Sequence, residues 1–206
     1  AHNVKVIGID TTNSVDSTSF MMFSNPALTN APLPAGLQSG INYTSATNAT
    51  LALFAPFKDY VYLLGDFNDW KVQTNYMLNR HFINSDSVVW WIDVTLSTAT
   101  EYAFQYLVDG TLRTGDPYSE KILDPWNDDD IPAINYPNLK PYPAGKTSQA
   151  VSVLQTMQSE YQWQVTDFQK PRKEKLIIYE LHVRDFSTQR NYQFLIDTLS
   201  YLKSLG

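Results

Sequence analysis

The sequence predicts a mainly β protein, a β-sandwich followed by one strand–loop–helix unit, and three observations support this prediction. Short strand-like runs separated by turn residues follow one another from about residue 43 to residue 131, which is the pattern of a sandwich. The composition is 14% aromatic and only 17% charged, as in many β-rich extracellular domains. After residue 175 the pattern changes to a continuous apolar run followed by leucines at helical spacing.

The expected sandwich strands are residues 50–55, 60–64, 88–96 and 102–108. Alternation along the third run places Trp90 and Trp91 on opposite faces, and the one that lies outside the core is the candidate for contact with another domain. Asp109-Gly110 stands between two such runs and predicts a hairpin turn. Residues 151–154 predict a further short strand, with a helix as the alternative.

The amino-terminal part is predicted as one strand, residues 4–9, followed by a linker. Residues 11–19 are a polar Ser/Thr/Asn/Asp tract, and residues 25–40 contain three Pro and two Gly, so both stretches are read as linker. The domain boundaries follow from this pattern. Residues 1–39 are the strand and linker, with the tail of a preceding domain as an alternative; the other segments are the sandwich (40–133), a Pro-rich connector (134–174) and the strand–loop–helix unit (175–206).

Composition excludes several kinds of function. The chain has no Cys, which rules out a disulfide scaffold, a Cys-zinc site and a thiol nucleophile. Its net charge of −6 argues against a nucleic-acid partner, and no apolar run approaches the ~20 residues of a membrane span. No metal site is expected, because the acidic run at residues 127–130 lacks the Gly and the distal Glu of a calcium loop and favours a solvated turn.

Residues 175–206 are predicted to form one strand and one helix, and the strand cannot be stable without neighbouring strands. Residues 176–183 form a continuous apolar run, typical of a strand covered on both faces. A helix follows, with its apolar positions at Leu195, Leu199, Leu202 and Leu205 and a capping Gly206. We therefore expect the chain to be part of a larger protein. The bare strand edges predict docking on the sandwich or pairing with a second copy in a fragment dimer.

Two motifs give a resemblance to known families. Residues 61–70, Val-Tyr-Leu-Leu-Gly-Asp-Phe-Asn-Asp-Trp, together with Trp91 and residues 102–110 and 116–118, resemble the starch-associated immunoglobulin-like (E-set) module of carbohydrate-binding family 48. Residues 176–187, Leu-Ile-Ile-Tyr-Glu-Leu-His-Val-Arg-Asp-Phe-Ser, are similar to the first strand of the α-amylase (β/α)₈ barrel, a TIM barrel of glycoside hydrolase family 13. The implied fold is an immunoglobulin-like sandwich followed by a truncated first βα unit of that barrel.

The resemblance implies a parent enzyme that cleaves α-glucosidic bonds with retention. A (β/α)₈ barrel needs about 250 residues, so this chain is expected to contain no catalytic residue and to be inactive alone. The expected partners are an α-glucan (starch, maltodextrin or pullulan) and the missing catalytic barrel of the same chain. A branching-type transferase parent and a non-catalytic glucan-binding or docking module are the alternatives. The implied location is secreted, periplasmic or at a bacterial cell surface.

Trp70 and Gln105 are the candidate carbohydrate-binding residues. Aromatic faces stack on the apolar faces of glucose rings, and Trp offers the largest area. In sugar-binding members of the module, the Trp that ends this motif is one platform, a second Trp follows the Asp-Gly turn, and a Lys contacts hydroxyl groups. Those last two positions hold Leu112 and Gln105 here, which weakens the expectation of starch binding. The alternative role of Trp70 is to fix its loop or pack against the barrel. No cofactor is expected in this chain, and the resemblance allows Ca²⁺ in the full-length parent.

Overall fold

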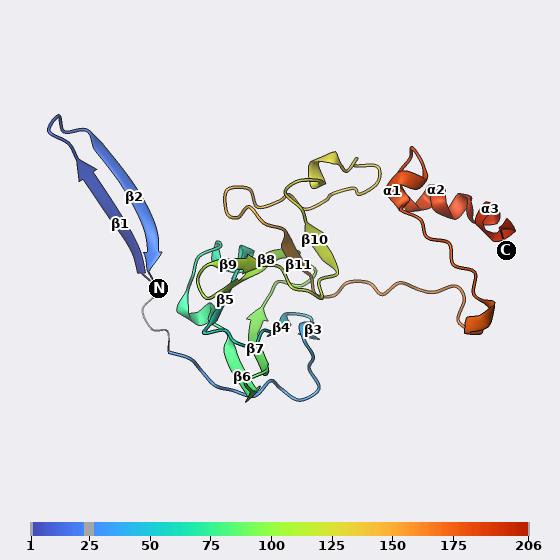
Figure 1. Cartoon of the computed structure of the whole chain (residues 1–206), viewed down its shortest axis with the longest axis horizontal. Helices are drawn as coiled ribbons and strands as arrows, with labels where there is room; N and C mark the ends of the chain where they lie inside the picture. Colours follow the sequence, from blue (N-terminus) through green and yellow to red (C-terminus); the bar gives the residue numbers. More distant parts are fainter. Residues whose placement is uncertain (1, 23–26, 206) are drawn as a thin grey trace. The chain divides into compact units, whose positions relative to one another are not determined.

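The computed structural model describes residues 2–22 and 27–205, which are mainly β with three short helices (Figure 1). They form two compact units. The first comprises the residues up to Asp129 together with residues 140–158, and the second comprises residues 130–139 and 159–206. Within the described residues, no helix has both the length and the apolar character needed to cross a bilayer.

Two antiparallel sheets build the centre of the first unit. One sheet has the order β3-β4-β7-β6, with β3 (Gly40–Ser45), β4 (Asn48–Phe54), β7 (Ser87–Thr95) and β6 (Asn79–Asn84). The other has the order β10-β11-β8-β5, with β10 (Lys121–Leu123), β11 (Val151–Leu154), β8 (Tyr102–Val108), β5 (Val61–Gly65), and β9 (Leu112–Thr114) also paired to β8. Short 3₁₀ turns are η1 (Asp66–Asn68), η2 (Thr74–Tyr76) and η3 (Asp128–Asp130). The four predicted sandwich strands and the strand at residues 151–154 are thereby confirmed.

Side chains of both sheets meet in one hydrophobic core, and Trp90 is its largest fully buried member. Its indole N–H donates to the Ala55 carbonyl at 2.8 Å, so the polar atom of the ring is satisfied inside the core. Trp91 faces the other side of β7, as the alternation predicts, and is partly exposed. Its indole N–H donates to the Ala31 carbonyl at 3.0 Å, so the amino-terminal segment of the same unit contacts the face predicted for another domain.

The predicted hairpin turn at Asp109-Gly110 forms between β8 and β9, where Val108 pairs with Leu112. Both turn residues have positive φ, 50° for Asp109 and 72° for Gly110, as this tight turn requires. The Asp109 carboxylate also accepts the backbone N–H groups of Asp59 at 2.8 Å and Tyr60 at 3.2 Å. The turn therefore also fixes the start of β5.

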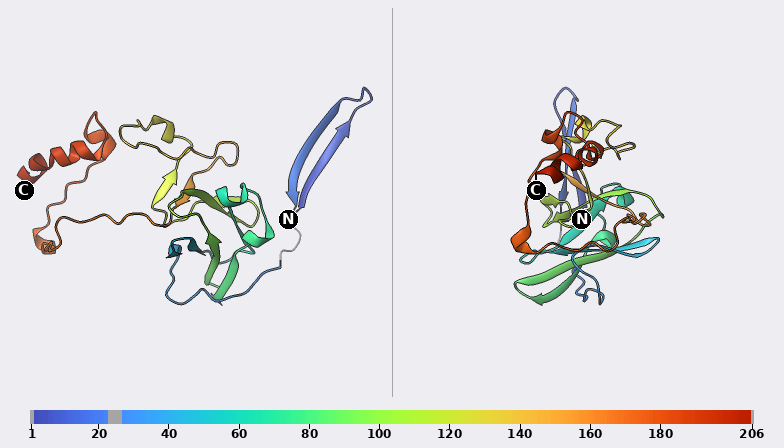
Figure 2. Two further views of the ribbon diagram at one scale, coloured as in Figure 1. Left: turned by 180° about the vertical axis from the view of Figure 1, so that it is seen from behind. Right: turned by 90° about the vertical axis from the view of Figure 1, so that its right-hand side faces the viewer.

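The linker prediction for residues 11–19 is wrong. The strand β1 (His2–Ile9) pairs along its full length with β2 (Val15–Met22), and Figure 2 shows the two strands side by side from two directions. Only the first residues of the polar tract make a turn, in which Asp10 Oδ1 accepts the N–H groups of Thr12 at 2.7 Å and Ser14 at 2.9 Å. Hydroxyl residues beyond a tight turn are compatible with a strand once a partner strand is in register.

Part of the second predicted linker, residues 25–40, also has a defined partner. Its positions 25 and 26 lie outside the described residues, but Asn30 bridges to Arg80 on β6. The Ala31 N–H donates to the Arg80 carbonyl at 3.1 Å, and the Arg80 N–H donates to the Thr29 carbonyl at 2.8 Å. Residues 29–31 therefore cover a stretch of the edge of β6.

The second unit contains η4 (Lys173–Lys175) and the helices α1 (Val183–Phe186), α2 (Tyr192–Asp197) and α3 (Leu199–Ser204). The predicted helix forms as two pieces, α2 and α3, with Thr198 between them; the Thr198 hydroxyl hydrogen-bonds the Phe194 carbonyl at 2.9 Å. Asn191 caps α2 by accepting the Phe194 N–H at 2.8 Å. The predicted cap Gly206 lies outside the described residues.

The predicted strand at residues 176–183 does not form. This segment has no ladder partner within the described residues, and Ile178 is 84% exposed. Leu176, Ile177 and Tyr179 are exposed as well, and docking of the segment on the sandwich stays a prediction. The physical reason is that an apolar run becomes a strand only when neighbouring strands satisfy its backbone groups on both edges. Pairing with a second copy remains a prediction.

Candidate functional site

The candidate site begins with the loop that follows β5, residues 65–71, called here the Trp70 loop. Asn68, which is buried, closes this loop by two hydrogen bonds. Its side-chain oxygen accepts the Gly65 N–H at 2.9 Å, and its amide group donates to the Leu63 carbonyl at 2.9 Å. A buried side chain with two hydrogen bonds to the end of the preceding strand fixes the loop in one conformation.

Trp70 lies against its own loop and is only 8% exposed. Asp69 and Trp70 both have positive φ, 51° and 59°, and this left-handed turn brings the indole N–H to Asp66 Oδ1 at 3.2 Å. Asp66 Oδ2 accepts the Ala103 N–H of β8 at 2.9 Å, so the same carboxylate connects Trp70 to the sheet. The geometry corresponds to the alternative role of Trp70, fixing its loop, and leaves little ring surface open for stacking on a sugar.

Gln105 does not reach the surface, so its predicted contact with sugar hydroxyl groups would require the residues that cover it to move, and that contact stays a prediction. It lies on β8 with 0% exposure. Its amide group donates to the Ala150 carbonyl at 2.8 Å and to the Gln149 carbonyl at 3.3 Å. Its side-chain oxygen is buried and has no hydrogen-bond partner within the described residues. The sequence could not reveal this burial, because the covering residues come more than forty positions later.

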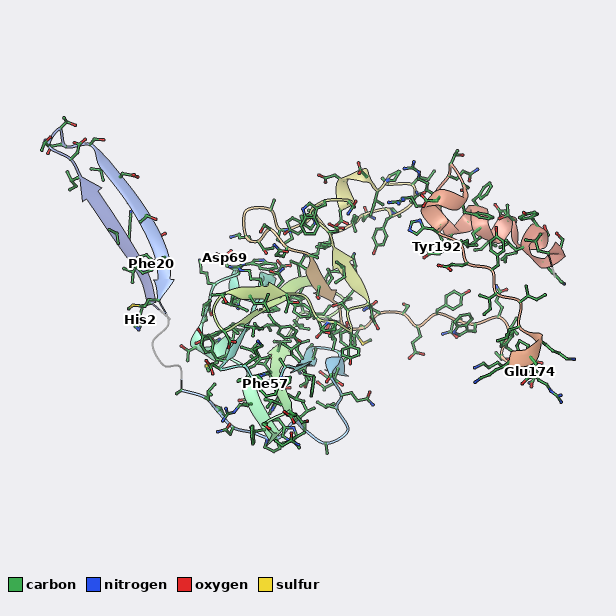
Figure 3. All side chains as sticks on the ribbon, viewed as in Figure 1. His2, Phe20, Phe57, Asp69, Glu174 and Tyr192 are labelled. Carbon is green, nitrogen blue, oxygen red and sulfur yellow. The ribbon has the colours of Figure 1, made fainter. Side chains whose placement is uncertain are left out.

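The covering segment is residues 140–150, called here the strap. Lys140 Nζ lies 3.0 Å from Asp66 Oδ2, and Lys146 Nζ lies 2.7 Å from Asp69 Oδ1, the residue labelled in Figure 3. The Arg113 guanidinium on β9 donates to the Lys146 carbonyl at 2.9 Å. The strap thus joins the Trp70 loop to the β8–β9 hairpin. The sequence predicts a connector for these residues. The one sequence feature that could have indicated the strap is the presence of Lys140 and Lys146 in a Pro-rich stretch, since both pair with carboxylates of the Trp70 loop.

Electrostatics favour this closed arrangement near neutral pH. Hydrogen bonds from Lys146 and Lys71 lower the pKa of Asp69 from 3.8 to about 2. Because the folded pKa lies below the unfolded value, the ion pairs stabilise the folded loop fully at pH above 3.8 and lose that contribution as the pH falls through about 2. Salt should weaken the same contacts, since these side chains are largely exposed.

Removing both strap lysines, in the variant Lys140→Ala with Lys146→Ala, is expected to raise solvent exchange of the Trp70 indole N–H by about fivefold, because two partly exposed ion pairs are lost. Hydrogen exchange followed by NMR would measure this proton directly. The indole N–H of Trp90, which is buried in the core, is the internal control and should keep its rate. Unchanged exchange at Trp70 would show that the lysines do not hold the strap.

A buried polar group next to the site ties β8 to β11. The Tyr106 hydroxyl donates to Asp116 Oδ2 at 2.7 Å, and the Asp116 N–H donates to Ser152 Oγ at 2.6 Å. Burial raises the pKa of Asp116, and burial together with the nearby carboxylate raises the pKa of Tyr106 well above 10. Tyr106 is 0% exposed and Asp116 is 4% exposed, so these groups are inaccessible to a substrate and serve as a structural contact.

The acidic turn at residues 127–130 is mostly exposed, as predicted for a solvated turn, with Asp128 partly buried. Asp128 Oδ2 accepts the Asp124 N–H at 2.9 Å, and Asp124 Oδ1 accepts the Trp126 N–H at 2.8 Å. Both carboxylates therefore stabilise the turn itself. In the part of the chain that the structure describes, no group of three or more His, Cys, Asp or Glu residues is arranged to hold a metal ion.

The geometry of the first unit is thus two antiparallel sheets around one core, with a closed Gly-Asp-Phe-Asn-Asp-Trp loop. Over 95 residues the chain is 32% identical to the malto-oligosyltrehalose trehalohydrolase of Saccharolobus solfataricus; these residues are 46% of this chain and 15% of that protein. The fold is similar to a crystal structure of a protein assigned as an α-amylase from Salmonella typhimurium, with a TM-score of 0.51 and 21% identity over 82% of this chain and 23% of that one.

No known protein-family profile matches the sequence. The two likenesses nevertheless confirm the predicted resemblance to the amino-terminal region of α-amylase family enzymes. The chain spans less than a quarter of the length of either relative.

Proposed function

We propose that this chain is the non-catalytic amino-terminal region of an enzyme that hydrolyses α-glucosidic bonds with retention. The observation that carries the proposal is the 32% identity to a trehalohydrolase over 95 residues. The similar fold over 82% of the chain supports it independently. The two core sheets are then an immunoglobulin-like sandwich of the carbohydrate-binding family 48 type, in a secreted, periplasmic or surface-attached bacterial protein.

We propose further that residues 175–206 begin the catalytic barrel. The exposed apolar segment at residues 176–179 supports this role, because its backbone would be satisfied by the neighbouring strands of a barrel. Pairing of this segment with a second copy of the chain is the alternative when those strands are absent.

Within such an enzyme, the sandwich would orient the catalytic region, and the face around the Trp70 loop would not bind starch. The burial of Trp70 and Gln105 supports this role, because Trp70 lies against its own loop and sugar could reach Gln105 only after the strap had moved. This favours the docking alternative for that face over the glucan-binding one. Any Ca²⁺ would be held by the catalytic region.

The proposal is tested by comparing the 206-residue chain with the complete reading frame that contains it. Both proteins are incubated with maltodextrin, pullulan and malto-oligosyltrehalose, and released sugar is followed by NMR. We expect the complete protein to release products first as the α-anomer, the outcome of retention. The 206-residue chain should release no sugar.

Three results would contradict the proposal: a reading frame that ends at Gly206, sugar release by the 206-residue chain, or products released first as the β-anomer. Hydrolysis of one substrate among the three would further identify the bond that the enzyme cleaves. Transfer of glucan segments without hydrolysis would instead support the branching-type alternative.

A further inference from the structure

The outer face of the sheet β3-β4-β7-β6 carries a row of polar side chains. Asn42 on β3 pairs with Thr50 on β4, and Thr50 pairs with Asp93 on β7. Directly paired residues share a face of the sheet, and the adjacent Leu51 and Ile92 are in the hydrophobic core. The polar row therefore faces away from the core, on a different sheet from the Trp70 loop and the strap.

The chain segment at residues 31–37 forms a wall beside this row. At one end the Trp91 indole N–H holds the Ala31 carbonyl at 3.0 Å. Just beyond the other end, the Gln38 N–H donates to Asn42 Oδ1 at 3.1 Å. Figure 1 shows the segment passing from the vicinity of β6 towards β3. Its anchors at both ends fix the wall relative to the sheet.

An open groove of about 470 Å³ lies between the wall and the sheet, within the range of about 300–1,000 Å³ typical of ligand sites. Pro34, Ala35 and Leu37 line the apolar side. The polar side consists of hydroxyl, amide and carboxylate groups from the strands β3, β4 and β7: Thr44, Ser45, Asn48, Thr50 and Asp93.

The polar groups are oriented by contacts with one another. The Thr50 hydroxyl, buried beneath the groove, donates to Asp93 Oδ1, while Asp93 itself is exposed. Asn48 Oδ1 accepts the Thr95 hydroxyl at 3.1 Å, and Asn48 Nδ2 donates to Ser45 Oγ at 3.1 Å. These contacts fix the Asp93 carboxylate and the Asn48 amide in position in the absence of a ligand, so less conformational entropy is lost when a ligand binds.

The chemistry of the groove selects the class of ligand. Among the described residues that line the groove there is one carboxylate and no Lys, Arg or His, so the groove disfavours the binding of an anion. A single carboxylate is too few charged ligands for a Ca²⁺ site. The groove places hydroxyl and amide groups opposite an apolar wall. A pyranose sugar matches this arrangement, because its neutral ring carries hydroxyl groups on the edge and C–H groups on the face.

We propose that this groove binds a short α-gluco-oligosaccharide, with Asp93 accepting sugar hydroxyl groups and the wall of Pro34 and Leu37 contacting a ring face. The binding of a sugar follows from the groove, while its identity as an α-glucan rests on the proposed function. The site lies away from Trp70 and Gln105, so the strap would not obstruct it.

The test is an NMR titration of the ¹⁵N-labelled 206-residue chain with maltotriose and, separately, with cellotriose. We expect maltotriose to shift amide signals of residues 34–50 and 91–95 with a millimolar Kd. Asp93→Asn should weaken binding by about tenfold, because hydrogen bonds to a charged acceptor are stronger than those to a neutral one. The amide oxygen of the variant can still accept the Thr50 hydroxyl, so the fold should be preserved.

Asp86→Asn is the matched control, because Asp86 is an exposed carboxylate at the turn between β6 and β7 and lies outside the groove. It should bind maltotriose like the unmodified chain. Absence of shifts with both sugars, or unchanged affinity in Asp93→Asn, would overturn the site. Shifts in the groove with cellotriose alone would support a sugar site there and contradict its specificity for α-glucans. That result would count against the proposed function and not against the groove as a sugar site.

Discussion

Replacing Trp90 with Ala is expected to lower the free energy of unfolding by about 3–5 kcal/mol. Trp90 is 0% exposed and contributes the largest fully buried side chain in the core shared by both sheets. The substitution would leave a large cavity between the sheets. It would also leave the Ala55 carbonyl without its 2.8 Å hydrogen bond from the indole.

Chemical denaturation of the two proteins would measure this difference, and Trp91→Ala provides a matched control. The control removes the same side chain one position along β7, from the partly exposed opposite face. Its loss should be clearly smaller, because less apolar area is buried and the neighbouring segment at Ala31 can adjust. Equal losses in the two variants would contradict the assignment of the two faces.

Gly65→Ala is expected to lower the free energy of unfolding by about 1–3 kcal/mol and to displace the Trp70 loop. A Cβ at this position would lie 2.6 Å from the Ala103 carbonyl oxygen and 2.7 Å from the Phe67 ring. The carbonyl belongs to the β8 backbone and cannot move without disturbing the sheet. The chain at Gly65 is fully extended, so the close approach of the two backbones and not the φ angle requires glycine.

Denaturation together with hydrogen exchange of the Trp70 indole N–H would measure both effects. Gly8→Ala is the control, since the nearest atom to its added Cβ is the Asp16 carbonyl oxygen at 3.9 Å. Its stability should change little. A fully stable Gly65→Ala protein with slow exchange at Trp70 would show that the loop can accommodate the methyl group.

Local patterns predicted the features that depend on near neighbours. The alternation correctly placed Trp90 and Trp91 on opposite faces, because a strand buried on one side must alternate. The turn at Asp109-Gly110 was equally predictable, since few residue pairs accept two positive φ angles. The resemblance to the α-amylase family came from motifs that each lie within a short stretch of sequence.

The features that failed depend on distant residues. Gln105 is a candidate sugar contact in the sequence, and nothing near it in the sequence reveals the strap that covers it. The tract at residues 11–19 contains the polar residues of a linker, but its pairing with β1 outweighs that composition. The apolar run at residues 176–183 has the composition of a strand and lacks the neighbouring strands that would make it one.

The position of β11 determines the order in which the second core sheet can be assembled during synthesis. β11 is the last strand of that sheet in the sequence, yet it lies between β8 and β10. At a synthesis rate of about 5–20 residues per second, β10 leaves the ribosome seconds before the strand that connects it to the sheet. Until residues 151–154 emerge, the stretch of β8 at residues 102–104 lacks its partner strand on one edge, although β9 already pairs with residues 106–108. A molecular chaperone that binds the nascent chain at this stage would therefore encounter an incomplete sheet.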